Sequence, residues 1–210
     1  STARRALQKR IAALLAGELD DPAQALDAYR ELLAKELDGD AIAAVRAIGE
    51  AREELRGDAA DVLVPVLEAA GDHEGRIDAL ELRLRAQTDP AERARTLKAI
   101  GRAADAELND ARRAEAAYLR ALVEEPADGE IHTELMRLAA RLGAAAWSRY
   151  ADALAERAGS TFDAVVTTEL YSRLGLIAEE HLADLPRAAR AYTQAAEQGG
   201  DSAPVLAALD

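Results

Sequence analysis

The sequence predicts an all-α protein made of stacked helical repeats, and three observations support this. Apolar residues recur at helical spacing along the chain, and one short phrase occurs three times. Half of the 210 residues are hydrophobic, with alanine dominant, while only 3% are aromatic. That composition suits closely packed helices better than sheets, which draw on β-branched and aromatic residues. The strict alternation that marks a strand is absent from the sequence.

The repeated phrase lies just before three of the tyrosines. It reads Glu18-Leu19-Asp20-Asp21 before Tyr29, Glu107-Leu108-Asn109-Asp110 before Tyr118, and His181-Leu182-Ala183-Asp184 before Tyr192. In each copy the leucine precedes the tyrosine by ten residues, and alanine stands four and one residues before the tyrosine. Such self-similarity is typical of repeat proteins, whose units bury their apolar faces against their neighbours. We therefore expect the three tyrosines to occupy equivalent, buried positions.

Start and stop signals divide the chain into helices. The first helix carries an apolar stripe, and the pairs Asp21-Pro22 and Asp89-Pro90 place an N-cap acceptor before a proline at the first helical position. Pro65 is expected to kink or shorten its helix. Glycines stand where helices are expected to end, at Gly39, Gly57, Gly71, Gly129, Gly143, Gly159 and Gly199-Gly200. The signals predict about 11–12 helices, at residues 5–19, 22–37, 41–56, 59–70, 73–87, 90–108, 111–125, 130–142, 145–158, 162–182, 186–198 and 203–210.

Three units carry a known pattern. One reads Leu97-x2-Ile100-Gly101-x2-Ala104, then Ala114-x3-Tyr118, and ends at Pro126; the last reads Tyr171-x2-Leu174-Gly175-x2-Ala178, then Ala188-x3-Tyr192; and the first has Ile11, Ala12 and Leu15, then Ala25-x3-Tyr29. In this pattern the chain resembles the tetratricopeptide-repeat (TPR) family, and it looks like the long acidic TPR arrays of bacteria. The resemblance implies a right-handed superhelical α-solenoid of antiparallel helix pairs. A small residue on the first helix would let the second approach, and an aromatic residue would fill the wedge.

The sequence also departs from the family pattern. Gly101 and Ala114 are thirteen residues apart, which predicts one extra residue in the turn between their helices. Tyr29 and Tyr118 are 89 residues apart and Tyr118 and Tyr192 are 74 apart, neither a multiple of the usual repeat of about 34. Degenerate units are expected between them, one carrying Leu63, Val66, Leu67, Ala70 and Leu80, the other carrying Leu135, Leu138, Ala139, Leu142, Ala146 and Tyr150.

No linker divides the chain, so residues 1–210 are predicted to form a single TPR-like domain. Neither end resembles the polar cap of a solenoid, which indicates a segment of a longer array. We expect self-association through the uncapped ends, at Leu7 and Ile11 on one side and at Val205, Leu206 and Leu209 on the other.

Charge and composition narrow the expected partners. Lys and Arg number 26 and Asp and Glu number 39, giving a net charge of −13, so nucleic acid and anionic lipid are poor partners. There is no cysteine. No apolar run reaches the roughly 18 residues of a membrane span and no secretory signal is visible, so membrane insertion is not expected and a cytoplasmic location is favoured.

The sequence offers little chemistry. The three histidines, His73, His132 and His181, form no zinc motif, and no phosphate-binding loop or nucleophile motif occurs. We therefore expect no catalysis, no cofactor and no metal. The tyrosines at repeat positions are interpreted as core rather than as a stacking surface for ligands.

One basic cluster stands out against the acidic background. Arg95, Lys98 and Arg102 are spaced i, i+3, i+7 on a helix of the first type, and Lys9 with Arg5 is predicted to continue this track. In TPR proteins such residues line a groove that takes peptides, some with acidic termini clamped by Lys and Arg. The competing interpretation is an ordinary solvated face whose cations pair with acidic neighbours such as Glu92 and Asp105.

The resemblance therefore implies a non-enzymatic interaction scaffold that binds a protein or peptide through the concave face of the superhelix. Two alternatives remain open at this point. A regulatory or sensor helical domain would hold a small ligand in a deep pocket and control an adjacent module. An α/α enzyme would need a buried acid–base pair with shifted pKa values.

Overall fold

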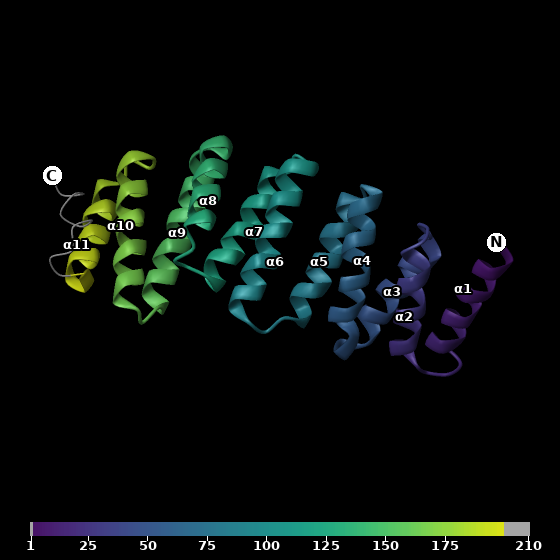
Figure 1. Cartoon of the computed structure of the whole chain (residues 1–210). Coiled ribbons are helices and arrows are strands. Elements are labelled where there is room, and N and C mark those ends of the chain that lie inside the picture. Colours follow the sequence, from purple (N-terminus) through teal and green to yellow (C-terminus); the bar gives the residue numbers. More distant parts are fainter. Residues whose placement is uncertain (1, 200–210) are drawn as a thin grey trace. The chain divides into compact units, whose positions relative to one another are not determined.

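The computed structural model describes residues 2–199 and consists of helices joined by short connections (Figure 1). Eleven α-helices follow one another, and no strand occurs among the described residues. The chain divides into two units, Ser1–Asn109 and Asp110–Asp210. The all-α prediction is confirmed, whereas the helix expected at 203–210 lies outside the described residues.

The helices correspond to the expected ones, with ends shifted by a few residues. The first unit contains α1 (Thr2–Ala16), α2 (Pro22–Leu33), α3 (Gly39–Ala51), a 3-10 turn (Glu53–Leu55), α4 (Arg56–Ala70), α5 (His73–Ala86) and α6 (Pro90–Arg102), which continues as a π-helical turn (Ala103–Glu107). The second contains α7 (Ala111–Glu124), α8 (Gly129–Leu142), α9 (Ala144–Ser160), α10 (Ala164–Glu180) and α11 (Leu185–Gly199).

Each copy of the repeated phrase forms a turn between two helices. The residue after the leucine has a left-handed backbone, with φ of 47° at Asp20, 52° at Asn109 and 53° at Ala183. The aspartate that follows caps the next helix by accepting a backbone N–H bond, from Gln24 to Asp21 (3.1 Å), from Arg113 to Asp110 (3.0 Å) and from Arg187 to Asp184 (3.0 Å). The phrase is thus the sequence of one kind of turn, in which a residue with a left-handed backbone is followed by the N-cap of the next helix.

Helix α6 ends in a π-helical turn, just before the second copy of the phrase. The N–H of Leu108 donates to the carbonyl oxygen of Ala103, five residues earlier, at 3.2 Å. A π-helical turn holds one residue more than an α-helical turn. The other two copies have the same bond from the leucine N–H to the carbonyl oxygen five residues earlier, from Leu19 to Leu14 at 3.0 Å and from Leu182 to Ile177 at 3.2 Å. Gly175 and Ala188 are also thirteen residues apart, so the longer spacing is not particular to the end of α6.

The same turn occurs a fourth time, between α4 and α5. Gly71 has φ 68°, and Asp72 accepts a bond from the N–H of Gly75 at 2.9 Å. Leu80 follows Asp72 by eight residues, as Tyr29 follows Asp21, so the degenerate unit placed here has the turn of a helix pair.

Helix α3 has no partner joined by such a turn. Its presence explains why Tyr29 and Leu80 are 51 residues apart while Leu80 and Tyr118 are 38 apart. In the first unit α1 contacts α3, α3 contacts α5, and α2 contacts α4. Helix α4, the first helix of the pair α4–α5, therefore lies alongside α2, the second helix of the pair α1–α2.

The three repeat tyrosines are buried, as the repeat alignment predicts. Tyr29, Tyr118 and Tyr192 are 4%, 1% and 8% exposed. A Cβ placed on Gly175 would lie 2.4 Å from a ring carbon of Tyr192. Glycine therefore permits the close approach of α10 and α11 that the repeat pattern implies.

Three smaller expectations have different outcomes. Pro65 lies inside α4 without ending it. The predicted shortening is therefore wrong, and the alternative of a kink stays a prediction. Gly39 and Gly129 begin helices rather than end them, because Asp38 and Asp128 cap the helices at these points. Leu7 and Ile11 are 65% and 53% exposed, as expected for that end, while the residues named at the other end, Val205, Leu206 and Leu209, lie outside the described residues.

Candidate functional site

The predicted basic cluster lies on α6. Because Arg95, Lys98 and Arg102 follow helical spacing within or at the end of this helix, they share one face. The side chain of Arg95 is 70% exposed, its Nε donates to the carbonyl oxygen of Ala91 at 3.3 Å, and its guanidinium lies 4.0 Å from the Glu92 carboxylate. Lys98 and Arg102 have interactions of their own. The helix therefore brings together the three predicted residues.

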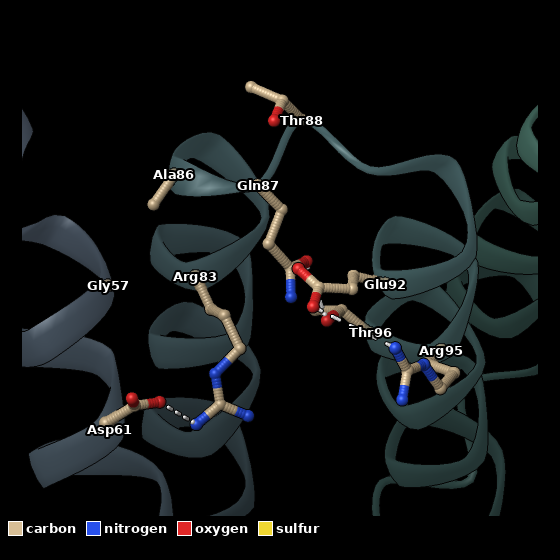
Figure 2. A pocket seen from close by; sticks show the side chains of 9 residues that line it. All are labelled: Gly57, Asp61, Arg83, Ala86, Gln87, Thr88, Glu92, Arg95 and Thr96. Atoms are coloured by element: carbon tan, nitrogen blue, oxygen red, sulfur yellow. Dashed lines mark hydrogen bonds and ion pairs between the residues drawn. The ribbon is translucent and has the colours of Figure 1, made fainter.

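A groove of about 590 Å³ adjoins Arg95. It lies between α4, α5 and α6, and Figure 2 shows the residues that line it. The lining residues are Gly57 and Asp61 from α4, Arg83 and Ala86 from α5, Gln87 and Thr88 from the connection, and Glu92, Arg95 and Thr96 from α6.

The wall of the groove between α5 and α6 is fixed by hydrogen bonds. Asp89 caps α6 by accepting from the N–H of Glu92 at 2.9 Å. The Nη1 of Arg93 donates to the carbonyl oxygens of Leu84 and Gln87, at 3.0 and 3.1 Å. Because α6 thus holds the end of α5 and the start of the connection, the groove is organised before any ligand arrives.

A buried threonine orients the Gln87 amide. Thr96 is 5% exposed, and its hydroxyl donates to Oε1 of Gln87 at 2.9 Å. The amide nitrogen of Gln87 therefore points into the space between the helices that carry Arg83 and Arg95 (Figure 2). This nitrogen adds two N–H donors to the groove.

Two acidic and two basic side chains line the groove, and the ion pairs between them are weak. Arg83 donates to Asp61 through one bond of 2.7 Å, and the Asp61 side chain is 64% exposed. Arg95 and Glu92 lie only at the limit of an ion pair. Exposed pairs of this kind contribute about 1 kcal/mol or less, so a partner's charge can replace either acidic side chain at small cost.

Lys9 lies away from this groove, on α1, and has a local role. Its Nζ donates to Asp38 at 3.0 Å and to Asp40 at 2.6 Å, and Arg5 contacts Asp38 and Glu36. The bond from Lys9, with those from the Ala41 N–H and Arg5, lowers the pKa of Asp38 to about 2. Since Asp38 caps α3, this cluster ties α1 to the start of α3.

The order of the helix pairs does not favour a continuous basic track from Arg5 and Lys9 to α6. The track assumes that all first helices share one side, and α3 breaks that regularity in the first unit, where α4 lies beside α2. The placement of Lys9 and Arg5 in one binding surface with α6 therefore stays a prediction.

The histidines have separate surroundings. His132 is 1% exposed, with Nδ1 2.7 Å from the Tyr150 hydroxyl and Nε2 2.8 Å from the carbonyl oxygen of Pro126. Burial lowers the pKa of His132, so neutral imidazole donates to Pro126 and accepts from Tyr150. His73 lies 3.6 Å from Glu107, and His181 stacks on Trp147 with ring centroids 3.7 Å apart.

Residues 2–199 contain no cluster of three or more histidine, cysteine or acidic side chains that could hold a metal ion. No described helix is long and apolar enough to cross a membrane.

Sequence reasoning found Arg95 but missed most of the groove. Asp61, Arg83 and Gln87 come from two other segments, and no spacing rule links residues 22 apart, as Asp61 and Arg83 are. The available signal was the polar segment Gln87-Thr88-Asp89 before Pro90, which marks the connection that forms one wall.

No family model matches the chain, and a search among curated proteins finds no relative. The resemblance to TPR proteins therefore rests on the quoted residues alone.

Proposed function

We propose that this chain is a non-enzymatic, TPR-like interaction scaffold that binds a protein or peptide through the concave face of a right-handed superhelix. The α6 face with Arg95, Lys98 and Arg102 would contact the partner, with Lys9 as a further contact. Binding would rest on shape and charge complementarity, with no bond made or broken.

The observation that carries this proposal is the polar groove beside Arg95. It presents side chains from three successive helices, and its framework is held by Asp89, Arg93 and Thr96. A preorganised surface loses little conformational entropy when it binds a flexible segment. A groove this open suits an extended chain, whereas a small ligand needs deeper enclosure.

Affinity purification from the source organism, followed by reconstitution with purified partner and titration calorimetry, tests the proposal. We expect a saturable complex with a protein or with a peptide from it. A metabolite that raises the melting temperature by several degrees, with no protein partner recovered, would favour the sensor alternative. Turnover in a hydrolase or transferase screen would contradict the proposal.

A further inference from the structure

We infer that this chain associates head to tail with a second copy of itself, through an exposed face of α1 in one molecule and a groove on α11 in the other. The α1 face consists of Arg4, Leu7, Arg10 and Ile11. The α11 groove has a volume of about 530 Å³ and is lined by α11 from Leu185 to Ala196, with Glu179 from the end of α10. This inference goes beyond the proposed function, because neither surface includes a residue of α6.

The α1 face leaves large apolar side chains in water. Leu7 and Ile11 are 65% and 53% exposed, and their i, i+4 spacing places them on the same side of the helix. Leu14, one turn further along, is partly exposed and continues this stripe. Covering apolar surface of this kind is favourable by about 25 cal/mol for each Å² removed from water.

The α11 groove has small side chains where the α1 face has large ones. Ala189, Thr193 and Ala196 are exposed and spaced i, i+4, i+7, so they share one side of α11. Leu185, which is 63% exposed, adds an apolar side chain to the lining. Helices pack by placing the protruding side chains of one into the hollows of the other, and the two surfaces are complementary in this sense.

The α1 face is positively charged. Helix α1 contains four basic residues and no acidic one. Arg5 and Lys9 are held by acidic residues before and at the start of α3, whereas Arg4 and Arg10 flank the apolar stripe. Arg10 is 67% exposed and lies 3.9 Å from Glu18, in an exposed pair that contributes little. Both arginines of the face can therefore meet a partner's carboxylates.

The α11 groove is negatively charged. The carboxylate of Glu179 lines it and accepts from the Tyr192 hydroxyl at 3.0 Å. Glu197 lies on an exposed position next to Ala196. The two arginines of α11, Arg187 and Arg190, line a different groove that includes Ala155 of α9. The acidic side chains therefore determine the charge at the α11 groove.

Charge and shape together select α1 of a second copy as the occupant. Contact between two α1 faces would bring the arginines of both copies together, and contact between two α11 grooves would place hollow against hollow. The chain's own segment 201–210 carries only Asp201 and Asp210 as charged residues, so it matches an acidic groove less well than α1 does. Because the two surfaces differ, each bound copy keeps one surface free, and association continues beyond the dimer unless a ring closes.

Sedimentation equilibrium of the whole chain tests this inference. The α1 face is small beside the roughly 20–30 residues that each partner contributes to a stable interface. Association should therefore be weak, and the measurements extend from about 10 µM to about 1 mM protein. We expect the weight-average mass to rise with concentration beyond twice that of one chain, and to rise less at about 500 mM salt, where exposed charges are screened.

Two variants separate contact between unlike surfaces from symmetric contact. Leu7→Gln/Ile11→Gln alters the α1 face, and Ala189→Arg/Ala196→Arg fills the α11 groove and reverses its charge. Each variant alone should stay monomeric, whereas an equimolar mixture should form a heterodimer and nothing larger, because each retains the surface that the other has lost. Val123→Gln, at a 56% exposed position of α7, is the matched control and should associate like the wild type. Circular dichroism checks that each variant is folded.

Other results would overturn the inference. A wild type that stays monomeric throughout the concentration range would show that α1 of a second copy does not occupy the groove, as would be the case if residues 203–210 covered it. Association that the α1 variant abolishes and the α11 variant does not would show a symmetric contact between α1 helices. Neither result bears on partner binding by α6, which the reconstituted complex tests separately.

Discussion

Replacing Gly175 by alanine should destabilise the last helix pair through Tyr192. The new Cβ would lie 2.4, 2.6 and 2.8 Å from three ring carbons of Tyr192. The ring is 8% exposed, and its hydroxyl donates to Glu179 at 3.0 Å. A ring held at both ends cannot move aside without breaking a bond or losing contacts.

Two opposing effects set the magnitude. Alanine is favoured over glycine inside a helix by about 1 kcal/mol, whereas overpacking a well-packed site costs about 1–3 kcal/mol. Separations this short place the steric cost in the upper half of its range, so the net loss should be about 1–2 kcal/mol. In a Tyr192→Ala background the clash is absent, and the same change should stabilise the protein by about 0.5–1 kcal/mol.

Urea denaturation of the four proteins, followed by far-ultraviolet circular dichroism, measures this reversal of sign. Trp147, the only tryptophan, lies on α9 in the same unit and gives an independent fluorescence signal. If Gly175→Ala has the same effect with and without the Tyr192 ring, the close approach of α10 and α11 is wrong.

Three further changes test other parts of the fold. Tyr118→Ala should cost about 3–5 kcal/mol of unfolding free energy because the ring is buried; a loss under about 1 kcal/mol in urea would contradict its place in the core. Ala183→Gly should stabilise by about 0.5–1 kcal/mol, since relief of left-handed strain outweighs the added chain entropy. The control Ala189→Gly, on an exposed position of α11, should instead destabilise, and equal effects would argue against the turn. Lys9→Gln should raise the pKa of Asp38 from about 2 toward its ordinary value, as NMR titration of the carboxyl would show. A lowered pKa stabilises the fold above about pH 4, and this stabilisation disappears as pH falls toward 2; the variant should therefore be less stable at neutral pH and lose less on acidification. An unchanged Asp38 pKa would contradict the ion pair.

The sequence was informative wherever a local rule decides the structure. The Asp-Pro pairs predicted the starts of α2 and α6. The apolar spacing predicted about 11–12 helices, of which eleven lie in the described residues, because helix period and capping act within a few residues. The repeated phrase predicted equivalent tyrosines. Its physical meaning, a left-handed residue followed by an N-cap, emerged from the backbone angles of Asp20, Asn109 and Ala183.

Features that depend on distant residues were out of reach. The sequence predicted the helix at 41–56 but not that α3 has no partner joined by the repeated turn, because its apolar pattern is that of any other helix. The one sign in the sequence is the 51-residue interval from Tyr29 to Leu80. Gly49 was overlooked although a Cβ there would lie 2.7 Å from Leu82. The groove needed Arg83 and Asp61 from separate helices, and their pairing follows from packing rather than from spacing.

The most direct test of the proposed scaffold compares partner affinity for the wild type and the double variant Lys98→Glu/Arg102→Glu. Titration calorimetry at about 50 and 500 mM salt separates charge effects from shape, because screening shortens the range of exposed charges severalfold. Circular dichroism and the melting temperature of the variant must first match those of the wild type.

The proposal predicts weaker partner binding by the variant at low salt and a smaller difference at high salt. Equal affinity of the two proteins at both salt concentrations would contradict it and would move the partner surface away from α6.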